Sequence, residues 1–279
     1  MKIFEILKYG KDELIKYDID DASLKTKLLL MHLLNVSKEY LIINNNKEID
    51  NIIVQKFNEF LNKLINGIPI QYITNRQEFM GLSFYVDENV LIPQPDTEIL
   101  VEETIKISKL FKNNLEILDM CTGSGAIAIS IKKAILDCKV TAADISTEAL
   151  NIAKKNAINN KVDIELIKSN MFENIKTRKF DIIVSNPPYI ETDTINNLSI
   201  EVQSEPKLAL DGGTDGLDFY KIFSLEADKY LNSNGYLLLE IGYNQKEKII
   251  KLLDNGKFTN IDCIKDLEGN NRVIIAKKV

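Results

Sequence analysis

Strand-like and helix-like segments alternate from residue 115 onward, and this alternation restricts the possible folds more than any other feature of the chain. Short apolar runs predict strands at residues 115–120, 139–145, 164–167, 180–185 and 236–241. Apolar residues at helical spacing predict helices at residues 126–136, 147–160, 217–231 and 245–253. Because parallel strands need long crossover connections, this order predicts an α/β fold with a mostly parallel sheet covered by helices on both faces.

The end of the chain departs from this alternation. The strand-like residues 258–267 and 273–277 are separated only by the short polar segment 268–272. A connection of this length joins two antiparallel strands as a hairpin. We therefore expect the last strand to run antiparallel to its neighbour.

The region before residue 94 has a different organisation. Residues 1–75 carry apolar side chains at helical spacing and predict a small helical domain. Residues 76–93 change to a period of two and predict a β-hairpin that joins this domain to the rest of the chain. We therefore divide the chain into a helical domain at 1–75, a hairpin linker at 76–93 and an α/β domain at 94–279.

The charge and histidine content exclude several classes of function. The net charge of −6 argues against the broad basic surface of nucleic-acid-binding proteins, so we expect no direct binding to nucleic acid. His32 is the only histidine, which excludes a nucleophile triad with a histidine base and a metal site with several histidines. We expect no bound metal.

The cysteines and the apolar segments indicate the compartment. Cys121, Cys138 and Cys263 are odd in number and show no C-x-x-C spacing, so neither a disulfide framework nor a zinc site is expected. Charged residues interrupt the first apolar residues, and no stretch approaches 18 consecutive apolar residues, so we expect neither a signal peptide nor a membrane span. A cytoplasmic protein is predicted.

The tetrapeptide Asn186-Pro187-Pro188-Tyr189 directly follows the apolar run at residues 180–185. The prolines fix φ at about −65° and remove two backbone donors, so the turn is rigid and its carbonyl groups are available as acceptors. The Asn186 side-chain oxygen and a proline carbonyl suit the two N–H bonds of a planar NH2 group, and the Tyr189 ring suits its flat face. The alternative is a turn in which the prolines only end the strand.

A second motif, Asp119-Met120-Cys121-Thr122-Gly123-Ser124-Gly125, follows the predicted strand 115–120 and opens a helix. Its glycines allow the backbone to approach a ligand closely. With Ala128, and with Asp144 located 21 residues after Gly123, the motif matches the dinucleotide-binding fingerprint. An NAD-dependent dehydrogenase is therefore one interpretation.

Three features favour S-adenosylmethionine over NAD. Asp119 would repel a pyrophosphate group but attract the ammonium group of methionine. Dinucleotide-binding folds do not normally end in an antiparallel hairpin, and residues 186–189 follow a strand beside the same crevice. The alternatives are a strand-end cap for Asp119 and a helix N-cap for Asp144.

These motifs make the chain similar to the release factor glutamine methyltransferase (HemK/PrmC) family over almost its whole length. The residues that carry the resemblance are 71–74, 91–98, 118–128, 185–190 and 205–217. The chain departs from the family pattern at four positions: Gln94 replaces the usual Arg, Cys121 a common Gly, Asn170 the usual Asp, and Ser204 a frequent aromatic residue.

The resemblance implies a Rossmann-like class I methyltransferase sheet with S-adenosylmethionine as the methyl donor. The loop would hold the methionine end, Asp144 the ribose, and the residues after the third strand the adenine. The implied cofactor-binding residues are Asp119, Cys121, Thr122, Gly123, Ser124, Gly125, Asp144, Asn170, Met171, Phe172 and Asn186.

The resemblance also implies the substrate, the glutamine of the Gly-Gly-Gln loop in class I peptide release factors, methylated on its side-chain amide nitrogen. Residues 186–189 would bind this glutamine, with Asn186, Pro187 and Tyr189 as the catalytic residues. The helical domain at 1–75 would dock the release factor.

Other interpretations remain open. Residues 186–189, which we call the clamp, would bind the side-chain amide of any glutamine. A glutamine of a ribosomal protein is therefore an alternative substrate. The amino group of an adenine, delivered by base flipping, would also fit, although the acidic charge balance and the lack of a basic recognition segment count against it. A non-catalytic adaptor that binds S-adenosylmethionine is disfavoured by the intact tetrapeptide.

Overall fold

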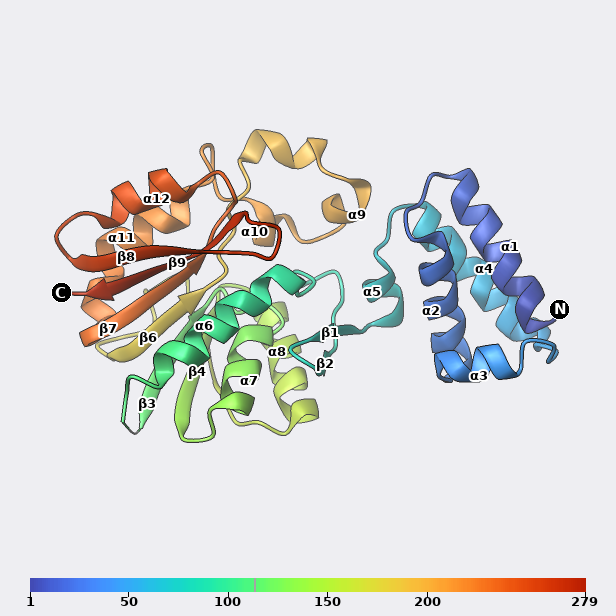
Figure 1. Ribbon diagram of the computed structural model, residues 1–279, viewed down its shortest axis with the longest axis horizontal. Coiled ribbons are helices and arrows are strands. Elements are labelled where there is room, and N and C mark those ends of the chain that lie inside the picture. Colours follow the sequence, from blue (N-terminus) through green and yellow to red (C-terminus); the bar gives the residue numbers. More distant parts are fainter. Residues whose placement is uncertain (113) are drawn as a thin grey trace. The chain divides into compact units, whose positions relative to one another are not determined.

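The computed structural model describes residues 1–112 and 114–279, which form two compact units (Figure 1). The smaller unit contains Met1–Arg76 and the short segment Ser199–Ser204, and the larger unit contains Gln77–Leu198 and Glu205–Val279. The boundary after residue 76 lies where the apolar pattern changes period. The sequence pattern did not indicate that residues 199–204 belong to the smaller unit.

The smaller unit is built from helices around its own core. Its helices are α1 (Ile3–Lys16), α2 (Ala22–Leu34), α3 (Lys38–Ile43), α4 (Asn51–Ile65), α5 (Ile70–Thr74) and α9 (Ile200–Gln203). Ile6, Leu29 and Phe57, from α1, α2 and α4, are fully buried against one another. The Ser204 hydroxyl donates a hydrogen bond of 3.0 Å to the Gly67 carbonyl and so fastens the segment 199–204 to this unit.

The larger unit contains, within the described residues, a seven-stranded sheet. Its strands are β3 (Leu115–Met120), β4 (Cys138–Asp144), β5 (Glu165–Lys168), β6 (Phe180–Ser185), β7 (Leu231–Glu240), β8 (Phe258–Lys265) and β9 (Asn271–Lys278), in the spatial order β5-β4-β3-β6-β7-β9-β8. The first five strands are parallel, and β9 is antiparallel to both β7 and β8. The prediction of a parallel sheet with an antiparallel last strand is confirmed.

Helices cover both faces of this sheet (Figure 1). The helices of the larger unit are η1 (Pro95–Thr97), α6 (Glu98–Ser108), α7 (Ala126–Ala134), α8 (Thr147–Asn160), η2 (Thr192–Asn197), α10 (Lys207–Leu210), α11 (Asp218–Tyr230) and α12 (Lys246–Leu253). Successive strand residues point to opposite faces, so Ile117 packs with α6 and α7, and Leu118 packs with α11 and α12. No helix in the described residues is long and apolar enough to cross a membrane.

The predicted hairpin at residues 76–93 is shorter in the structure, and all of its residues except Arg76 belong to the larger unit. Only β1 (Gln77–Phe79) and β2 (Leu82–Phe84) pair, in antiparallel fashion. The residues after β2 do not continue the ladder because distant side chains accept their backbone N–H groups. Tyr85 donates to Asn156 Oδ1 at 2.7 Å, and Ile92 donates to Glu205 Oε2 at 2.8 Å.

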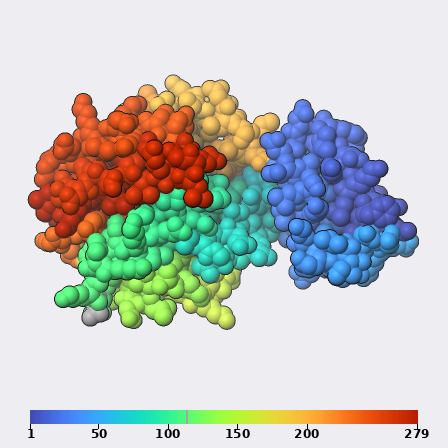
Figure 2. Space-filling model, viewed as in Figure 1, coloured from blue at the N-terminus to red at the C-terminus, as the bar shows by residue number. Residues whose placement is uncertain are grey.

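The C-terminal strands contribute to the surface of the larger unit. Figure 2 shows them in red beside α6 in green, in agreement with the contact between α6 and β9. The sheet order reverses between β3 and β6, which are neighbours in space although β4 and β5 lie between them in sequence. Open α/β sheets bind ligands at the carboxyl ends of strands at such a switch point.

Candidate active site

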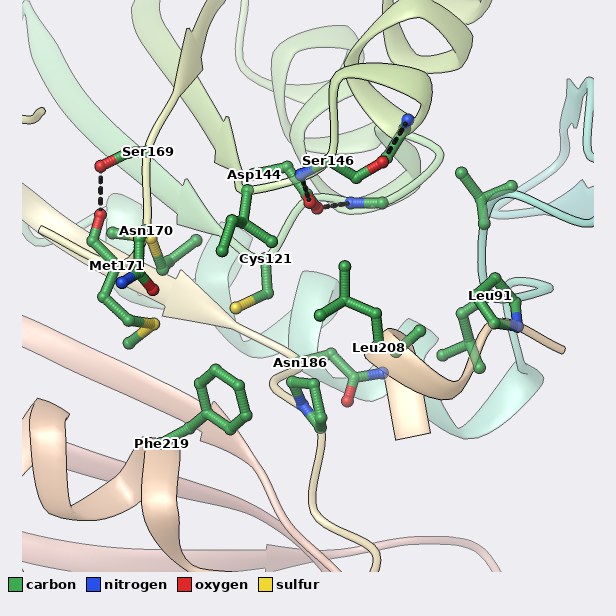
Figure 3. A pocket seen from close by; sticks show the side chains of 18 of the residues that line it. Leu91, Cys121, Asp144, Ser146, Ser169, Asn170, Met171, Asn186, Leu208 and Phe219 are labelled. Carbon is green, nitrogen blue, oxygen red and sulfur yellow. Dashed lines mark hydrogen bonds between the residues drawn. The ribbon is translucent and has the colours of Figure 1, made fainter. Parts of the chain in front are cut away.

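A pocket lies at this switch point, beyond the carboxyl ends of β3, β4, β5 and β6 (Figure 3). All the residues that line it belong to the larger unit. The strand ends contribute polar side chains, including Asp144 and Asn186, whereas Leu91, Leu208 and Phe219 come from other segments and supply apolar walls.

The loop between β3 and α7 turns sharply because several of its residues have a left-handed backbone conformation, with positive φ angles. Cys121, Gly123 and Gly125 have φ angles of 62°, 53° and 80°. A Cβ atom at Gly125 would lie 3.0 Å from the Cβ atom of Ala153, so both conformation and space favour glycine there. A Cβ atom at Gly123 would meet nothing within 4 Å, which leaves open space beside its backbone.

Asp144 holds this loop in place from the end of β4. Its Oδ2 atom accepts the Gly123 N–H bond and its Oδ1 atom accepts the Ser146 N–H bond, both at 2.9 Å. Burial raises the pKa of Asp144, while these hydrogen bonds lower it. The N-cap of α8 is Ser146, whose hydroxyl oxygen accepts the Ala149 N–H bond at 3.1 Å, so Asp144 is a pocket residue and not the helix cap.

Asp119 lies behind the loop and not on the pocket wall. It is fully buried, and its Oδ2 atom accepts hydrogen bonds from the Thr122 hydroxyl at 2.6 Å and the Ala128 N–H group at 3.2 Å. Burial raises the pKa of Asp119 to about 7 despite these hydrogen bonds. Its Oδ1 atom has no hydrogen-bond partner in the described part of the chain, so an interaction with a ligand ammonium group would involve this atom.

The residues after β5 do not all face the pocket, although the sequence predicts an adenine site there. Asn170 and Met171 line the pocket. Phe172 is instead buried in the core, where its ring stacks on Tyr230 with 4.6 Å between the ring centroids. An aromatic wall is supplied by Phe219 of α11, whose ring faces the pocket in Figure 3.

The tetrapeptide 186–189 leaves the end of β6 beside this pocket. Asn186 and Pro188 line the pocket. Pro187 is buried and Tyr189 is half-buried, and neither belongs to the pocket lining. The Nδ2 atom of Asn186 donates a hydrogen bond of 3.2 Å to the hydroxyl oxygen of Thr97. In this orientation, the Nδ2 end of the Asn186 amide is engaged with the protein.

Distant segments hold the tetrapeptide from behind. A Cβ atom at Gly212 would lie 2.7 Å from the Cα atom of Tyr189, so the backbones of these residues approach as closely as glycine permits. The Gly212 N–H group donates to the Ile190 carbonyl at 2.8 Å. The side-chain amide of Gln245 donates to the carbonyl oxygens of Tyr189 at 2.9 Å and Gly216 at 3.1 Å.

The predicted site residues thus divide into two sets. On the pocket wall are Cys121, Gly123, Asp144, Asn170, Met171, Asn186 and Pro188. The pocket lining does not include Asp119, Thr122, Ser124, Gly125, Phe172, Pro187 or Tyr189.

Sequence reasoning missed other residues of the site. Leu91 and Thr97 could have been found from their place in the motif at residues 91–98. Phe219 lines the pocket, but in the sequence it is only one of several apolar residues at helical spacing, and nothing there distinguishes it as a site residue. Within the residues that the structure describes, no group of three or more His, Cys, Asp or Glu side chains could hold a metal ion.

Comparisons with known proteins agree with this arrangement. Residues 95–214 match the family model of the methyltransferase small domain, and residues 5–74 match that of the PrmC N-terminal domain. The chain is 37% identical to a release factor glutamine methyltransferase of Clostridium acetobutylicum, with 99% of this chain and 96% of the relative covered. It is 40% identical to one of Fusobacterium nucleatum subsp. nucleatum, with 98% of this chain and 78% of the relative covered.

A solved methyltransferase structure from Pyrococcus furiosus is similar in fold, with a TM-score of 0.54 and 22% identity over 79% of this chain and 98% of that chain. The fold, both matching domain models and the identity to full-length relatives point to one conclusion. The chain belongs to the release factor glutamine methyltransferase family and is an enzyme of the protein-glutamine methyltransferase class.

Proposed function

We propose that this enzyme transfers a methyl group from S-adenosylmethionine to the side-chain amide nitrogen of the glutamine in the Gly-Gly-Gln loop of class I peptide release factors. The observation that carries the proposal is the orientation of Asn186 on the pocket wall. Because its Nδ2 atom donates to Thr97, its Oδ1 atom is the end of the amide that remains to accept a hydrogen bond. An acceptor beside a methyl-donor pocket suits a substrate NH2 group.

The pocket residues fit S-adenosylmethionine. The Asp144 carboxylate suits the two hydroxyls of a ribose, and the open space at Gly123 suits the methionine end. Met171 and Phe219 offer apolar surface to the adenine ring, and the amide of Asn170 offers it a hydrogen bond. When bound, the cofactor supplies an electrophilic methyl group on a sulfonium centre.

The tetrapeptide has to compensate for a weak nucleophile. The lone pair of an amide nitrogen is delocalised into the carbonyl group, and no side chain at neutral pH deprotonates it usefully. Asn186 Oδ1 and the Pro187 carbonyl accept its two N–H bonds and so hold the nitrogen in line with the methyl group. Such positioning contributes on the order of 7–11 kcal/mol to catalysis.

The same acceptors stabilise the positive charge that grows on the nitrogen as the new C–N bond forms. One preorganised contact of this kind contributes about 3–4 kcal/mol. The Tyr189 ring covers the amide plane and excludes water. The proton leaves to solvent after the transfer, so the site needs no histidine.

We assign the docking of the release factor to the helical domain, residues 1–75, with the hairpin at 76–93 as its linker. Ile42, Ile43 and Ile52 of this domain are 63%, 80% and 62% exposed, and a protein partner would cover such apolar surface. The intact enzyme should therefore methylate a short Gly-Gly-Gln peptide with a kcat/KM at least roughly tenfold below that for the whole release factor. Equal values would contradict docking outside the active site.

The proposed substrate is tested by transfer of a radiolabelled methyl group. Purified release factor should accept the label, and a release factor in which the Gly-Gly-Gln glutamine is replaced by alanine should not. A ribosomal protein and nucleic acid serve as parallel acceptors. Label on the alanine variant equal to that on the wild type would overturn the assignment, as would preferential labelling of either parallel acceptor.

A further inference from the structure

Glu240 is a buried carboxyl group directly behind the proposed clamp. It is the last residue of β7. The parallel register pairs Ser185 of β6 with Leu239 of β7, so the next residues, Asn186 and Glu240, lie side by side at the carboxyl ends of the two strands. Its side chain is only 2% exposed, and it does not line the pocket. The sequence motifs assigned it no role.

The contacts of Glu240 lead to the clamp. The Tyr189 hydroxyl donates to its Oε1 atom over a long distance of 3.5 Å, and its backbone carbonyl accepts a 2.8 Å hydrogen bond from Tyr220. Its Oε2 atom has no hydrogen-bond partner of normal geometry among the described residues. The Thr97 hydroxyl lies close enough to lower the pKa of this carboxyl group.

The charge of Glu240 is not needed to balance a cation. Arg272 also lowers the pKa of Glu240, but its guanidinium group is already paired with Asp96 and Asp266 at 2.9 Å each. Burial dominates and raises the pKa of Glu240 to about 7. A buried carboxyl group without an ion-pair partner lowers the stability of the fold. Stability alone therefore does not explain a glutamate at this position.

The hydrogen bond between Asn186 and Thr97 explains what the carboxyl group can do. A threonine hydroxyl has a single proton to donate. While Thr97 accepts from Asn186 Nδ2, that proton needs another acceptor. Glu240 has an oxygen without a hydrogen-bond partner among the described residues, and its carboxyl group is close enough to Thr97 for the two to interact. Without this acceptor, the Thr97 proton can turn to Asn186 Oδ1, and the rotated amide would present its NH2 group to the NH2 group of the substrate.

We propose that Glu240 is a positioning residue for methyl transfer, which accepts from the hydroxyls of Thr97 and Tyr189 and thereby keeps the oxygen of the Asn186 amide directed at the substrate. The inference rests on the proposed function, because it assumes that Asn186 binds the glutamine amide. Glu240 itself touches neither substrate nor cofactor.

The first test compares Glu240→Leu with Glu240→Gln. The leucine variant removes both acceptor oxygens and should lower kcat roughly tenfold or more, with the KM for release factor and the calorimetric Kd for S-adenosylmethionine within about threefold of wild type. The glutamine variant keeps one acceptor and should recover most of kcat. Full activity of the leucine variant, or equal losses in both variants, would overturn the proposal.

A variant of Thr97, the residue between Glu240 and Asn186, provides a second test in case Glu240→Leu does not fold. Thr97→Val is isosteric and removes the hydroxyl that connects Glu240 to Asn186, so it should reproduce the loss of kcat. Tyr220→Phe is the matched control, since it removes a buried hydroxyl bonded to the Glu240 backbone but leaves the carboxyl group in place. It should lower the melting temperature and leave kcat unchanged.

A double-mutant cycle separates this inference from the proposed function. If Glu240 acts through Asn186, then Glu240→Leu should lower kcat by no more than about twofold in the background of Asn186→Ala. Additive losses would contradict the positioning role while leaving the clamp intact. Full activity of Asn186→Ala alone would instead overturn the clamp and, with it, the proposed function.

Discussion

The two sides of the candidate active site are built in different ways. The loop at residues 119–125 takes its shape from left-handed residues of its own and from Asp144 at the end of the next strand in sequence. The tetrapeptide 186–189 is held by Thr97, Gly212, Gln245 and Glu240, which are distant from it in sequence.

The geometry of the cofactor loop and the geometry of the clamp therefore depend on different parts of the molecule. A loop with local determinants tolerates changes elsewhere, because its turn is set by its own φ angles. A clamp with remote determinants depends on several packed segments at once, and small shifts in any of them reach the catalytic amide. We expect substitutions that leave the cofactor loop unaffected to disturb the clamp.

The largest effect is expected for Asn186→Ala, which removes the acceptor of the clamp and leaves the cofactor loop unchanged. The kcat for release factor should fall roughly a hundredfold or more, since a preorganised contact of this kind is lost. The Kd for S-adenosylmethionine, measured by calorimetry, should stay within about tenfold of wild type. A comparable loss of cofactor affinity and rate would show that the two sides are not separable.

Gly212→Ala tests the remote support of the clamp. The new Cβ atom would lie 2.7 Å from the Cα atom of Tyr189, and relief of such overpacking typically costs about 1–3 kcal/mol, so kcat should fall roughly tenfold. Gly81→Ala is the control, because its φ of 70° strains the backbone of any replacement residue, whereas nothing lies within 4 Å of the new atom. Gly212 has no such φ angle, so the strain at Gly212 comes from the close contact alone. The control should lose some stability and retain its kcat.

Asp144→Asn tests the opposite side. The change removes the charge that would bind the ribose hydroxyls, and it replaces one of the two oxygens that accept the Gly123 and Ser146 N–H bonds with an NH2 group. The Kd for S-adenosylmethionine should therefore rise at least about tenfold. Because the folded-state pKa of Asp144 is raised, wild-type affinity should decline as the pH falls toward that pKa, whereas the asparagine variant should lack this decline. Near-normal kcat at saturating cofactor is expected, and a collapse of kcat would assign Asp144 to the chemical step.

Gln245→Ala gives the smallest expected effect on the rate. Its side-chain amide donates a part-buried hydrogen bond to the Tyr189 carbonyl and a buried one to the Gly216 carbonyl. Loss of these hydrogen bonds should reduce the free energy of unfolding by about 1–3 kcal/mol and lower kcat a few-fold. Asn255→Ala is a control away from the clamp, since Asn255 is exposed and its side-chain amide donates a hydrogen bond to the Ser224 carbonyl. Equal rates in both variants would argue against support of the clamp by Gln245.

The same contrast explains how much of the molecule the sequence predicts. The alternating region and its antiparallel end follow from local periodicity, and the structure confirms them. The pocket positions of Cys121, Gly123 and Asp144 follow from a motif with local geometry.

Contacts between segments that are distant in sequence could not be predicted from local sequence patterns. Phe172 and Phe219 are both apolar residues near the pocket, and only the packing of α11 on the sheet decides which ring lines it. Glu240 ends a strand-like run, and its depth becomes apparent only when β6 and β7 are paired. The hairpin at 76–93 was overestimated because Tyr85 and Ile92 bond to remote side chains instead of to a partner strand.

The segment Ser199–Ser204 gives the chain an interleaved architecture. The backbone passes between the two units at residue 76 and again on both sides of this segment, so neither unit is a contiguous cassette. A chimera that exchanged residues 1–76 alone would replace the Gly67 carbonyl to which Ser204 donates, although Ser204 would remain with the recipient. Recombination between members of the family therefore has to treat residues 199–204 as part of the module that they pack with.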